Sequence, residues 1–406
     1  MKKKLYITRA IKIICFALAV VISTYLLQAY VLKRNDNNTL RMDGFFVEDK
    51  ESLDVVYIGA SDVYAGYSAG LAYEEYGLTS YPFATQASPP QVVLPQIKDV
   101  IKHQNPKMIV VEINSFMYKD NDLPAEASHR MFVDNIPCDD IWADYIKENF
   151  PEEDQIEYWL PIIKYHGSWS DYPWKFKFLL TDLALRQRGY SSFRGFKTVA
   201  NEFHPGGKLY NDTLAETDDK LPLGYTSERC LRETLDYLKE NNIKNVIFTR
   251  FPHIVNNKAY SRFKRCNTAQ QIIEESGFDF INLERYGEQI GIDVNKDFYN
   301  WDHLNIYGAE KLTRYFCDKL TKEYGVTPNE LTESQKAEWA ESVKTYKMIY
   351  YYSAEMIKRR SELGKNDNSG TTVSEDDKSV KTIEKYARKT HPELFADEAT
   401  EAAKAE

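Results

Sequence analysis

The sequence predicts an α/β fold in which a parallel β-sheet lies between two layers of helices. Four short runs of consecutive apolar, β-branched-rich residues are typical of buried strands. They cover residues 54–59, 108–113, 245–249 and 278–283. Helical patterns separate them, and strands that alternate with helices form parallel sheets covered on both faces. We therefore expect a three-layer α/β/α domain over residues 54–325.

An apolar segment near the N-terminus, Ile13–Leu32, is long enough to cross a bilayer as a helix. Five basic residues precede it and two follow it, which predicts a cytoplasmic N-terminus. A cleaved signal peptide is the main alternative, but the run is long for one and no small-x-small site follows it. We expect residues 1–34 to form a cytoplasmic tip and an uncleaved single-pass anchor in the cell membrane. A polar linker at 35–53 would then lead to an extracytoplasmic domain.

Further elements follow in order along the domain. A short strand is expected at residues 80–84, and an amphipathic helix beginning at a proline at Pro90–Gln104. Other helical patterns lie at residues 70–76, 227–241, 259–276 and 307–324.

Three segments depart from the strand–helix alternation. An insertion at about 116–222 is rich in Trp, Tyr and Phe, and we expect it to form a cap on the active-site face. The simpler interpretation for most of these aromatic residues is that they pack against one another in a small core. A helix at 326–363 is expected to pack back on the domain. The polar tail at 364–406 is expected to be mostly disordered, with a short helix near 380–390.

Polar residues follow two of the predicted strands at their carboxyl ends. Ser61 follows the strand that ends at Gly59, Asn114 follows a second strand, and His303 precedes the last helix of the domain. Ligands of parallel sheets bind at the carboxyl ends of the strands, so these residues are expected to meet at one edge. A serine hydroxyl needs a nearby base to act as a nucleophile. The sequence therefore predicts a Ser61–His303 pair, with a helix-capping serine and a turn histidine as the structural alternatives.

These segments resemble three motifs of the SGNH (GDSL-like) hydrolase superfamily, more narrowly its membrane-anchored members linked to acylation of cell-surface polymers. The first motif, Gly-Asp-Ser, resembles Gly59-Ala60-Ser61, and the third, Gly-x-Asn-Asp, resembles Glu112-Ile113-Asn114-Ser115. The last, Asp-x-x-His, resembles Asn300-Trp301-Asp302-His303. The resemblance spans about residues 54–324 and implies a flavodoxin-like SGNH domain.

The resemblance also implies a role for each matching residue. Ser61 would be the nucleophile and His303 the base, and the family's orienting acid would stand at Asn300. Asn300 can hold the imidazole through its amide oxygen, and Asp302 remains the alternative orienting residue. The backbone N–H of Ser61 and the side-chain amide of Asn114 are the expected oxyanion donors.

Several other residues are weaker candidates. The glycine of the family's second motif has no clear counterpart, and Gln86, within residues 84–88, is the substrate-binding candidate there. Arg130 could bind an anionic glycan or pair with Asp134, and His253 could line the cleft or be structural. The sequence contains no phosphate-binding loop and no metal-ligand cluster that we recognise, so neither a cofactor nor a metal is expected.

Charge and cysteine content narrow the classes of partner. The chain has a net charge of −9, and residues 1–34 hold seven basic and no acidic residues, so the remainder has a net charge of −16. This acidity argues against nucleic acid as the partner. The five cysteines are scattered without a Cys-x-x-Cys motif, which argues against zinc and leaves disulfides and buried thiols both open.

The resemblance and these observations imply an extracytoplasmic serine O-acyltransferase or esterase. Its acyl group would be acetyl or a similar small group, its substrate a cell-envelope or secreted polysaccharide or a teichoic-acid-like polymer, and its partner a membrane O-acyltransferase. The alternative is a non-catalytic SGNH-fold protein that binds glycan or scaffolds an assembly complex. A lipase or thioesterase for free lipids is a third, weaker interpretation.

Overall fold

The chain divides into two compact units, a larger one of residues 37–135 and 190–406 and a smaller one of residues 1–36 and 136–189. The computed structural model describes residues 2–26, 37–165, 167, 191–205, 217–255, 260–285, 287–365 and 370–396.

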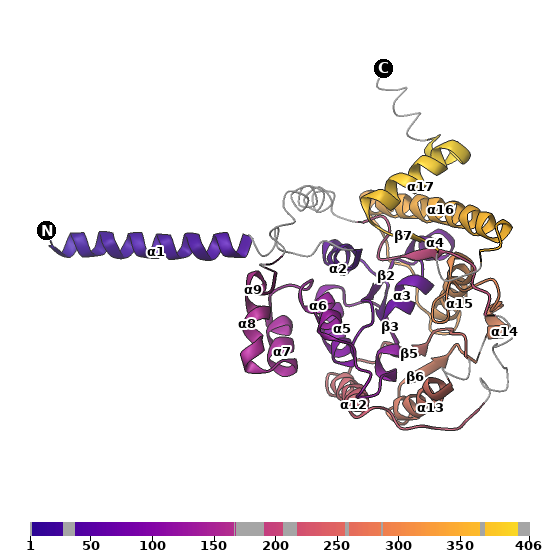
Figure 1. Cartoon of the computed structure of the whole chain (residues 1–406), viewed down its shortest axis with the longest axis horizontal. Coiled ribbons are helices and arrows are strands. Elements are labelled where there is room, and N and C mark those ends of the chain that lie inside the picture. Colours follow the sequence, from indigo (N-terminus) through magenta and orange to yellow (C-terminus); the bar gives the residue numbers. More distant parts are fainter. Residues whose placement is uncertain are drawn as a thin grey trace, which may run out of the picture. The chain divides into compact units, whose positions relative to one another are not determined.

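Five parallel strands form the central sheet of the larger unit (Figure 1). They are β1 (Val55–Gly59), β2 (Ser80–Ala84), β3 (Met108–Glu112), β5 (Val246–Arg250) and β6 (Asp279–Asn282). Their order is β2-β1-β3-β5-β6, and every neighbouring pair is parallel. This is the strand order of flavodoxin-like doubly wound sheets. The predicted parallel α/β class and the predicted strands are confirmed.

Both faces of the sheet are covered because both sets of alternating strand residues are apolar. Tyr57 and Val110 belong to the core cluster that also holds Leu312 and Phe316 of α15. Their neighbours along the strands point to the opposite face and are equally buried. The helices α3 (Ser61–Gly66), α4 (Ala69–Tyr76) and α15 (Ile306–Lys322) pack together on one side (Figure 1). The helices α5 (Pro90–His103), α12 (Tyr225–Glu240) and α13 (Tyr260–Glu275) form a connected layer on the other.

The segment expected to be a linker is partly a packed helix. Residues 37–47 form α2 (Asn37–Val47), which contacts β2. Met42 and Phe45 are fully buried, and the ring of Phe45 stacks on Phe83 of β2 with 4.1 Å between centroids. The linker expectation was wrong for these residues, because apolar residues at helical spacing, Met42 and Phe45 among them, form a helix face that is buried.

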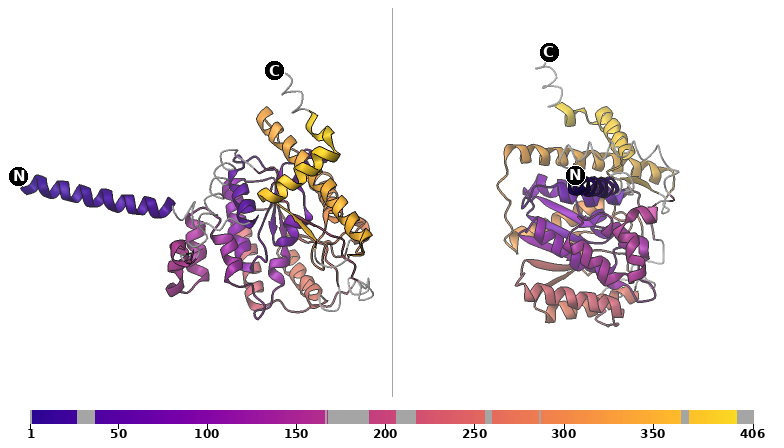
Figure 2. Two further views of the ribbon diagram at one scale, coloured as in Figure 1. Left: turned by 45° about the horizontal axis from the view of Figure 1, so that its top comes forward. Right: turned by 90° about the vertical axis from the view of Figure 1, so that its left-hand side faces the viewer.

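Two further helices follow the last helix of the α/β unit. The long helix α16 (Glu333–Glu362) contacts α4 and confirms the helix expected at 326–363. The C-terminal segment then forms β7 (Thr371–Val373), α17 (Asp377–Thr390) and the 3-10 helix η4 (Pro392–Phe395). Strand β7 pairs antiparallel with β4 (Thr198–Ala200), and α17 packs on α16 (Figure 2).

The expectation of a disordered tail was therefore wrong for residues 370–396, whereas the helix near 380–390 is confirmed. Ile383, Ala387 and Phe395 are buried in a core cluster with Ile349 of α16. A few apolar residues in a polar segment cannot fold alone, but they can be buried against an existing helix. Residues 397–406 lie outside the described part of the chain.

The expected insertion at about 116–222 is divided between the two units. The 3-10 helix η2 (Ile113–Met117), α6 (Glu126–Val133) and residues 191–205 belong to the larger unit, with Phe193 and Phe196 in its core. The smaller unit holds α7 (Asp140–Asn149), α8 (Glu152–Trp159) and α9 (Pro161–Tyr165).

Aromatic rings pack against one another within the smaller unit. Trp142 and Trp159 meet edge to face at 4.9 Å, and Phe150 stacks on Tyr158 at 3.8 Å. These contacts form the small aromatic core that was the simpler interpretation of these residues from the sequence. Trp169, Tyr172 and Trp174 lie outside the described residues.

The N-terminal helix α1 (Lys2–Leu26) is long and apolar enough to cross a membrane. Its apolar stretch is Tyr6–Thr24, and none of these residues is buried. The expected span Ile13–Leu32 overlaps this stretch over residues 13–24. Residues 27–36 lie outside the described part.

None of the five cysteines forms a disulfide. Cys230, Cys266 and Cys317 are buried thiols, which is one of the two states that the sequence left open, whereas Cys15 and Cys138 are exposed.

Candidate active site

Ser61 lies at the carboxyl end of β1, where the chain turns sharply into α3. Gly59 ends the strand, and Ser61 is the first residue of the helix. A side chain at Gly59 would stand only 2.7 Å from Val63 Cγ2 and 3.0 Å from Glu112 Cβ. A glycine is therefore required for the close approach of β1, α3 and β3 that places Ser61 at the sheet edge.

His303 lies in a loop that is tied down immediately before α15. Phe298 and Leu304 form an antiparallel bridge, and the N–H of Tyr299 donates to the carbonyl of His303. The side chain of Asn305 caps α15, and its Nδ2 donates to backbone carbonyls within the loop. The histidine is thus held on a fixed turn.

Ser61, His303 and Asn300 form a hydrogen-bonded chain. Ser61 Oγ lies 2.7 Å from His303 Nε2, and His303 Nδ1 lies 2.9 Å from Asn300 Oδ1. The backbone N–H of Asp302 also donates to Asn300 Oδ1, at 2.9 Å, so the amide oxygen and not the NH2 group faces the imidazole. Nδ1 therefore carries the ring proton, and Nε2 presents its lone pair to the Ser61 hydroxyl. This is the tautomer that a general base requires.

The surroundings of His303 favour the neutral imidazole. Burial lowers the pKa of His303, and the charges of His253 and Lys197 lower it further, against the raising effect of Asp62 and Asp302. The ring of Tyr299 stacks on the imidazole, nearly parallel at 7° and with 5.1 Å between centroids. At neutral pH the imidazole is therefore uncharged and able to accept the serine proton.

Two unoccupied hydrogen-bond donors lie on neighbouring strand ends. Ser61 is the first residue of α3, so its N–H has no partner within the helix. Asn114 follows β3, the strand next to β1, and its Oδ1 is occupied by Arg250 Nη1 at 2.8 Å. Among the described residues, no hydrogen bond is made by the Ser61 N–H or by Asn114 Nδ2. Such donors are what an oxyanion needs.

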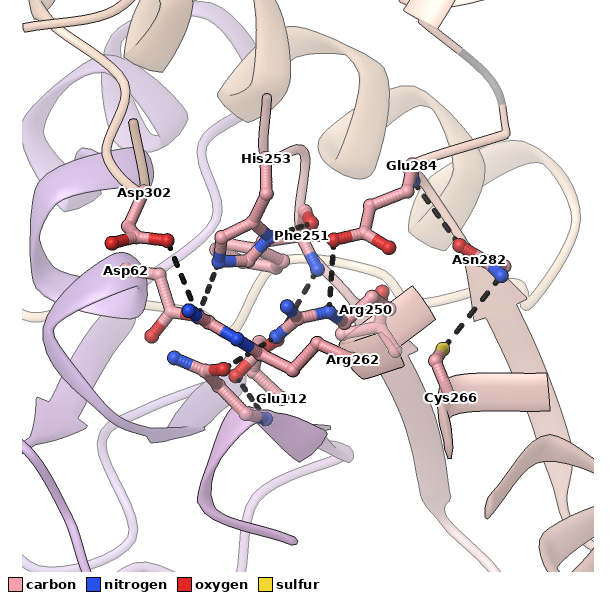
Figure 3. A network of polar contacts seen from close by, with 12 residues as sticks. Asp62, Glu112, Arg250, Phe251, His253, Arg262, Cys266, Asn282, Glu284 and Asp302 are labelled. Carbon is pink, nitrogen blue, oxygen red and sulfur yellow. Dashed lines mark hydrogen bonds and ion pairs between the residues drawn. The ribbon is translucent and has the colours of Figure 1, made fainter. Parts of the chain in front are cut away.

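A buried charged network lies beside these residues, and sequence reasoning missed most of it (Figure 3). It consists of Asp62, Glu112, Arg250, His253 and Glu284, each at most 5 % exposed. Arg250 Nη1 lies 3.3 Å from Glu112 Oε1, and Arg250 Nε lies 3.1 Å from Glu284 Oε1. His253 bridges Glu284 at 3.1 Å and Asp62 at 3.3 Å.

A sequence signal for this network existed. Glu112 and Arg250 are the last residues of buried strands, and Glu284 follows the end of β6 by two residues. Charged residues at the carboxyl ends of successive parallel strands point to one site. The sequence allowed two interpretations of His253, a residue that lines the cleft or a structural residue. In the structure it belongs to this buried group.

The protonation states of the network balance its charges. Burial and the negative charge of Asp62 raise the pKa of Glu112 well above its usual range. Burial also opposes the ionised form of Asp62, but the hydrogen bond and charge of His253 outweigh it and lower the pKa of Asp62. Burial and Arg250 act to lower the pKa of His253, yet its bonds to Asp62 and Glu284 raise it to about 9. Burial opposes the ionised form of Glu284 too, but Arg250 and His253 outweigh it and lower its pKa. These directions favour a neutral Glu112 beside the carboxylates of Asp62 and Glu284.

The other predicted site residues lie apart from the Ser–His–Asn chain. Asp302 is not bonded to the imidazole; it pairs with Arg262 at 3.2 Å, so the orienting contact is made by Asn300. Arg130 is buried in α6, with Nε 2.7 Å from Glu126 and Nη1 3.6 Å from Asp134, which is the structural pairing that the sequence allowed.

Gln86 is exposed in the turn after β2, the strand on the other side of β1. No hydrogen bond joins it to any part of the chain that the structure describes. Ala87, next to it, has φ of 48°, a left-handed conformation that favours glycine. This turn is where the resemblance would place the glycine of the second motif.

No protein-family model, curated protein sequence or solved structure matches this chain. The functional conclusion therefore depends on the geometry of this site.

Proposed function

We propose that this protein is a membrane-anchored, extracytoplasmic serine O-acyltransferase or esterase with an SGNH-like fold. Its substrate would be a cell-envelope or secreted polysaccharide, or a teichoic-acid-like polymer, carrying acetyl or another small acyl group. The observation that carries the proposal is the hydrogen-bonded chain of Ser61, His303 and Asn300, with 2.7 Å and 2.9 Å between successive groups.

The chemistry follows from the positions of the atoms. Ser61 Oγ attacks the carbonyl carbon of the acyl ester while its proton passes to His303 Nε2. The carbonyl oxygen becomes an oxyanion, for which the Ser61 N–H and Asn114 Nδ2 are the available donors. The protonated imidazole then gives its proton to the departing alkoxide, and the acyl group remains on Ser61. The same imidazole then takes a proton from a polymer hydroxyl or from water as that oxygen attacks the acyl carbon. The bond between Ser61 Oγ and the acyl carbon breaks, the imidazolium returns the proton to Oγ, and the acyl group leaves on the polymer or as the free acid.

Asn300 limits the turnover rate that we expect for this reaction. Its amide oxygen holds the imidazole in the required tautomer but does not neutralise the imidazolium formed in the transition state. We therefore expect slower turnover than with a carboxylate at this position. Slow acyl transfer to a polymer suits such a centre better than rapid hydrolysis.

The remaining expectations fit around this centre. The apolar helix α1 supports a membrane anchor, with the domain outside the cytoplasm and a membrane O-acyltransferase as the source of the acyl group. In this proposal the aromatic-rich insertion, about residues 116–222, acts as a cap.

Hydrolysis of 4-nitrophenyl acetate by the full-length protein in detergent tests the proposal. We expect slow turnover that Ser61→Ala abolishes, and labelling of Ser61 by a fluorophosphonate that depends on His303. Addition of an acetylated or acceptor polysaccharide then separates hydrolysis from transfer. Wild-type protein that neither turns over the ester nor reacts with the fluorophosphonate would contradict the proposal.

A non-catalytic glycan-binding or scaffold protein is the second candidate. The observation that favours it is Asn300, an amide where a serine hydrolase usually has an acid. Polymer binding that persists unchanged in Ser61→Ala, without any turnover by the wild type, would establish this alternative.

A further inference from the structure

We propose that Arg250 is a positioning residue that aims the Asn114 side-chain amide at the oxyanion. This inference rests on the proposed function, and it extends the site from the Ser61–His303 centre into the buried network beside it.

Arg250 controls which way the Asn114 amide faces. Arg250 Nη1 donates to Asn114 Oδ1 at 2.8 Å. A guanidinium only donates hydrogen bonds, so the amide oxygen must face Arg250 and Nδ2 must point the other way. Within the described residues Nδ2 has no other partner, so it remains free to donate to substrate.

The backbone of Asn114 is held from the same place. Its N–H donates to Glu112 Oε2 at 2.7 Å, and Glu112 Oε1 lies 3.3 Å from Arg250 Nη1. One nitrogen of Arg250 thus contacts both the amide oxygen of Asn114 and the carboxyl group that caps its backbone. The position and the orientation of the amide are determined together.

Arg250 is held in place by its own contacts, so it can fix the orientation of Asn114. It is 1 % exposed, and its Nε donates to Glu284 Oε1 at 3.1 Å. His253 contacts the same Glu284 oxygen (Figure 3). The planar fork of a guanidinium can satisfy Glu284, Glu112 and Asn114 at once, whereas a lysine ammonium is a single point charge on a flexible stem.

A double-mutant cycle on the full-length protein in detergent tests the inference, with 4-nitrophenyl acetate as substrate and a fluorophosphonate to count reactive Ser61. We expect Asn114→Ala to lower kcat by about 10²–10³-fold, as loss of an oxyanion donor does. We expect Arg250→Lys to lower kcat by about 10- to 100-fold with KM changed less than about twofold. The reason is that the Asn114 amide is still present and loses only its orientation toward the oxyanion. In the Asn114→Ala background, Arg250→Lys should change kcat by less than about threefold.

Arg262→Lys is the matched control. Arg262 pairs with Asp302 and makes no bond to Asn114, so its effect should multiply with that of Asn114→Ala. An Arg250→Lys effect that also multiplies with Asn114→Ala, or a kcat for Arg250→Lys within about twofold of wild type, would overturn the inference.

Asn114→Asp keeps the test decisive if Arg250→Lys does not fold. A carboxylate there retains an oxygen for Arg250 but loses the NH2 donor. We expect kcat to fall as far as in Asn114→Ala while Tm stays at or above the wild-type value. A Tm as low as that of Asn114→Ala, or wild-type kcat, would overturn the inference. Absence of both turnover and serine labelling in the wild type would overturn the proposed function and, with it, this inference.

Discussion

Replacing Asn300 by aspartate should make the candidate active site faster. In the structure Asn300 Oδ1 already accepts hydrogen bonds from His303 Nδ1 and from the N–H of Asp302. An aspartate oxygen can accept the same two bonds, so the geometry is preserved. What changes is the charge that faces the imidazolium formed when Ser61 loses its proton.

The size of the gain follows from hydrogen-bond energies. A bond between neutral groups contributes about 0.5–1.5 kcal/mol, and a bond to a charged group about 1.5–3 kcal/mol. The additional stabilisation of the imidazolium is therefore about 1–1.5 kcal/mol, which corresponds to about a 5- to 13-fold increase in kcat. The same carboxylate should raise the pKa of His303 and shift the acid limb of the pH profile to higher pH.

The assay is kcat/KM for an acetyl ester across pH 4.5–8 for Asn300→Asp, Asn300→Ala and Asp302→Asn. Asn300→Ala removes the acceptor that holds the imidazole and should lower kcat/KM. Asp302→Asn should matter less, because Asp302 faces Arg262 and not the ring. A large loss in Asp302→Asn together with near-wild-type activity in Asn300→Ala would refute the reasoning and make Asp302 the orienting acid.

Four other outcomes are expected. The acid limb of kcat/KM for the wild type should have its midpoint below pH 6.5, because burial lowers the pKa of His303 and only the neutral imidazole acts as base; a midpoint above 7 would contradict this. The free energy of unfolding, measured in urea, should fall as pH rises from 6.5 through about 9, because His253 is protonated in the folded protein up to about 9 and in the unfolded chain only up to 6.5. The linked stability is roughly 3 kcal/mol, and His253→Gln should reduce the slope; an unchanged slope would contradict this. Gly59→Ala should lower the free energy of unfolding by about 1–3 kcal/mol and reduce turnover. The reason is that the Cβ of the new alanine would lie 2.7 Å from Val63 Cγ2 and 3.0 Å from Glu112 Cβ. An unchanged Tm by calorimetry would argue against the tight turn between β1 and α3. Protease treatment of intact cells should remove the domain and leave α1 in the membrane, and complete protection would reverse the predicted orientation.

Local sequence alone was enough to predict the parallel α/β class and the position of Ser61. The strands are continuous apolar runs because both faces of a parallel sheet are buried, and that pattern is readable without knowing the neighbours. Ser61 comes directly after such a run, and His303 precedes an amphipathic helix. The rule that strand ends share one edge was then sufficient to expect the two side chains together.

The tertiary structure decided which polar residues belong to the site. The contact between Arg250 and Asn114 exists because β5 lies next to β3 in the sheet, although the residues are 136 positions apart. The choice of Asn300 over Asp302 depends on a turn in which the N–H of Asp302 itself bonds the amide oxygen. Likewise, apolar residues of α2 and of the largely polar helix α17 are buried because Phe83 and α16 lie beside them. Strand order and burial of this kind arise from contacts between distant residues, and the residue types within one segment do not encode them.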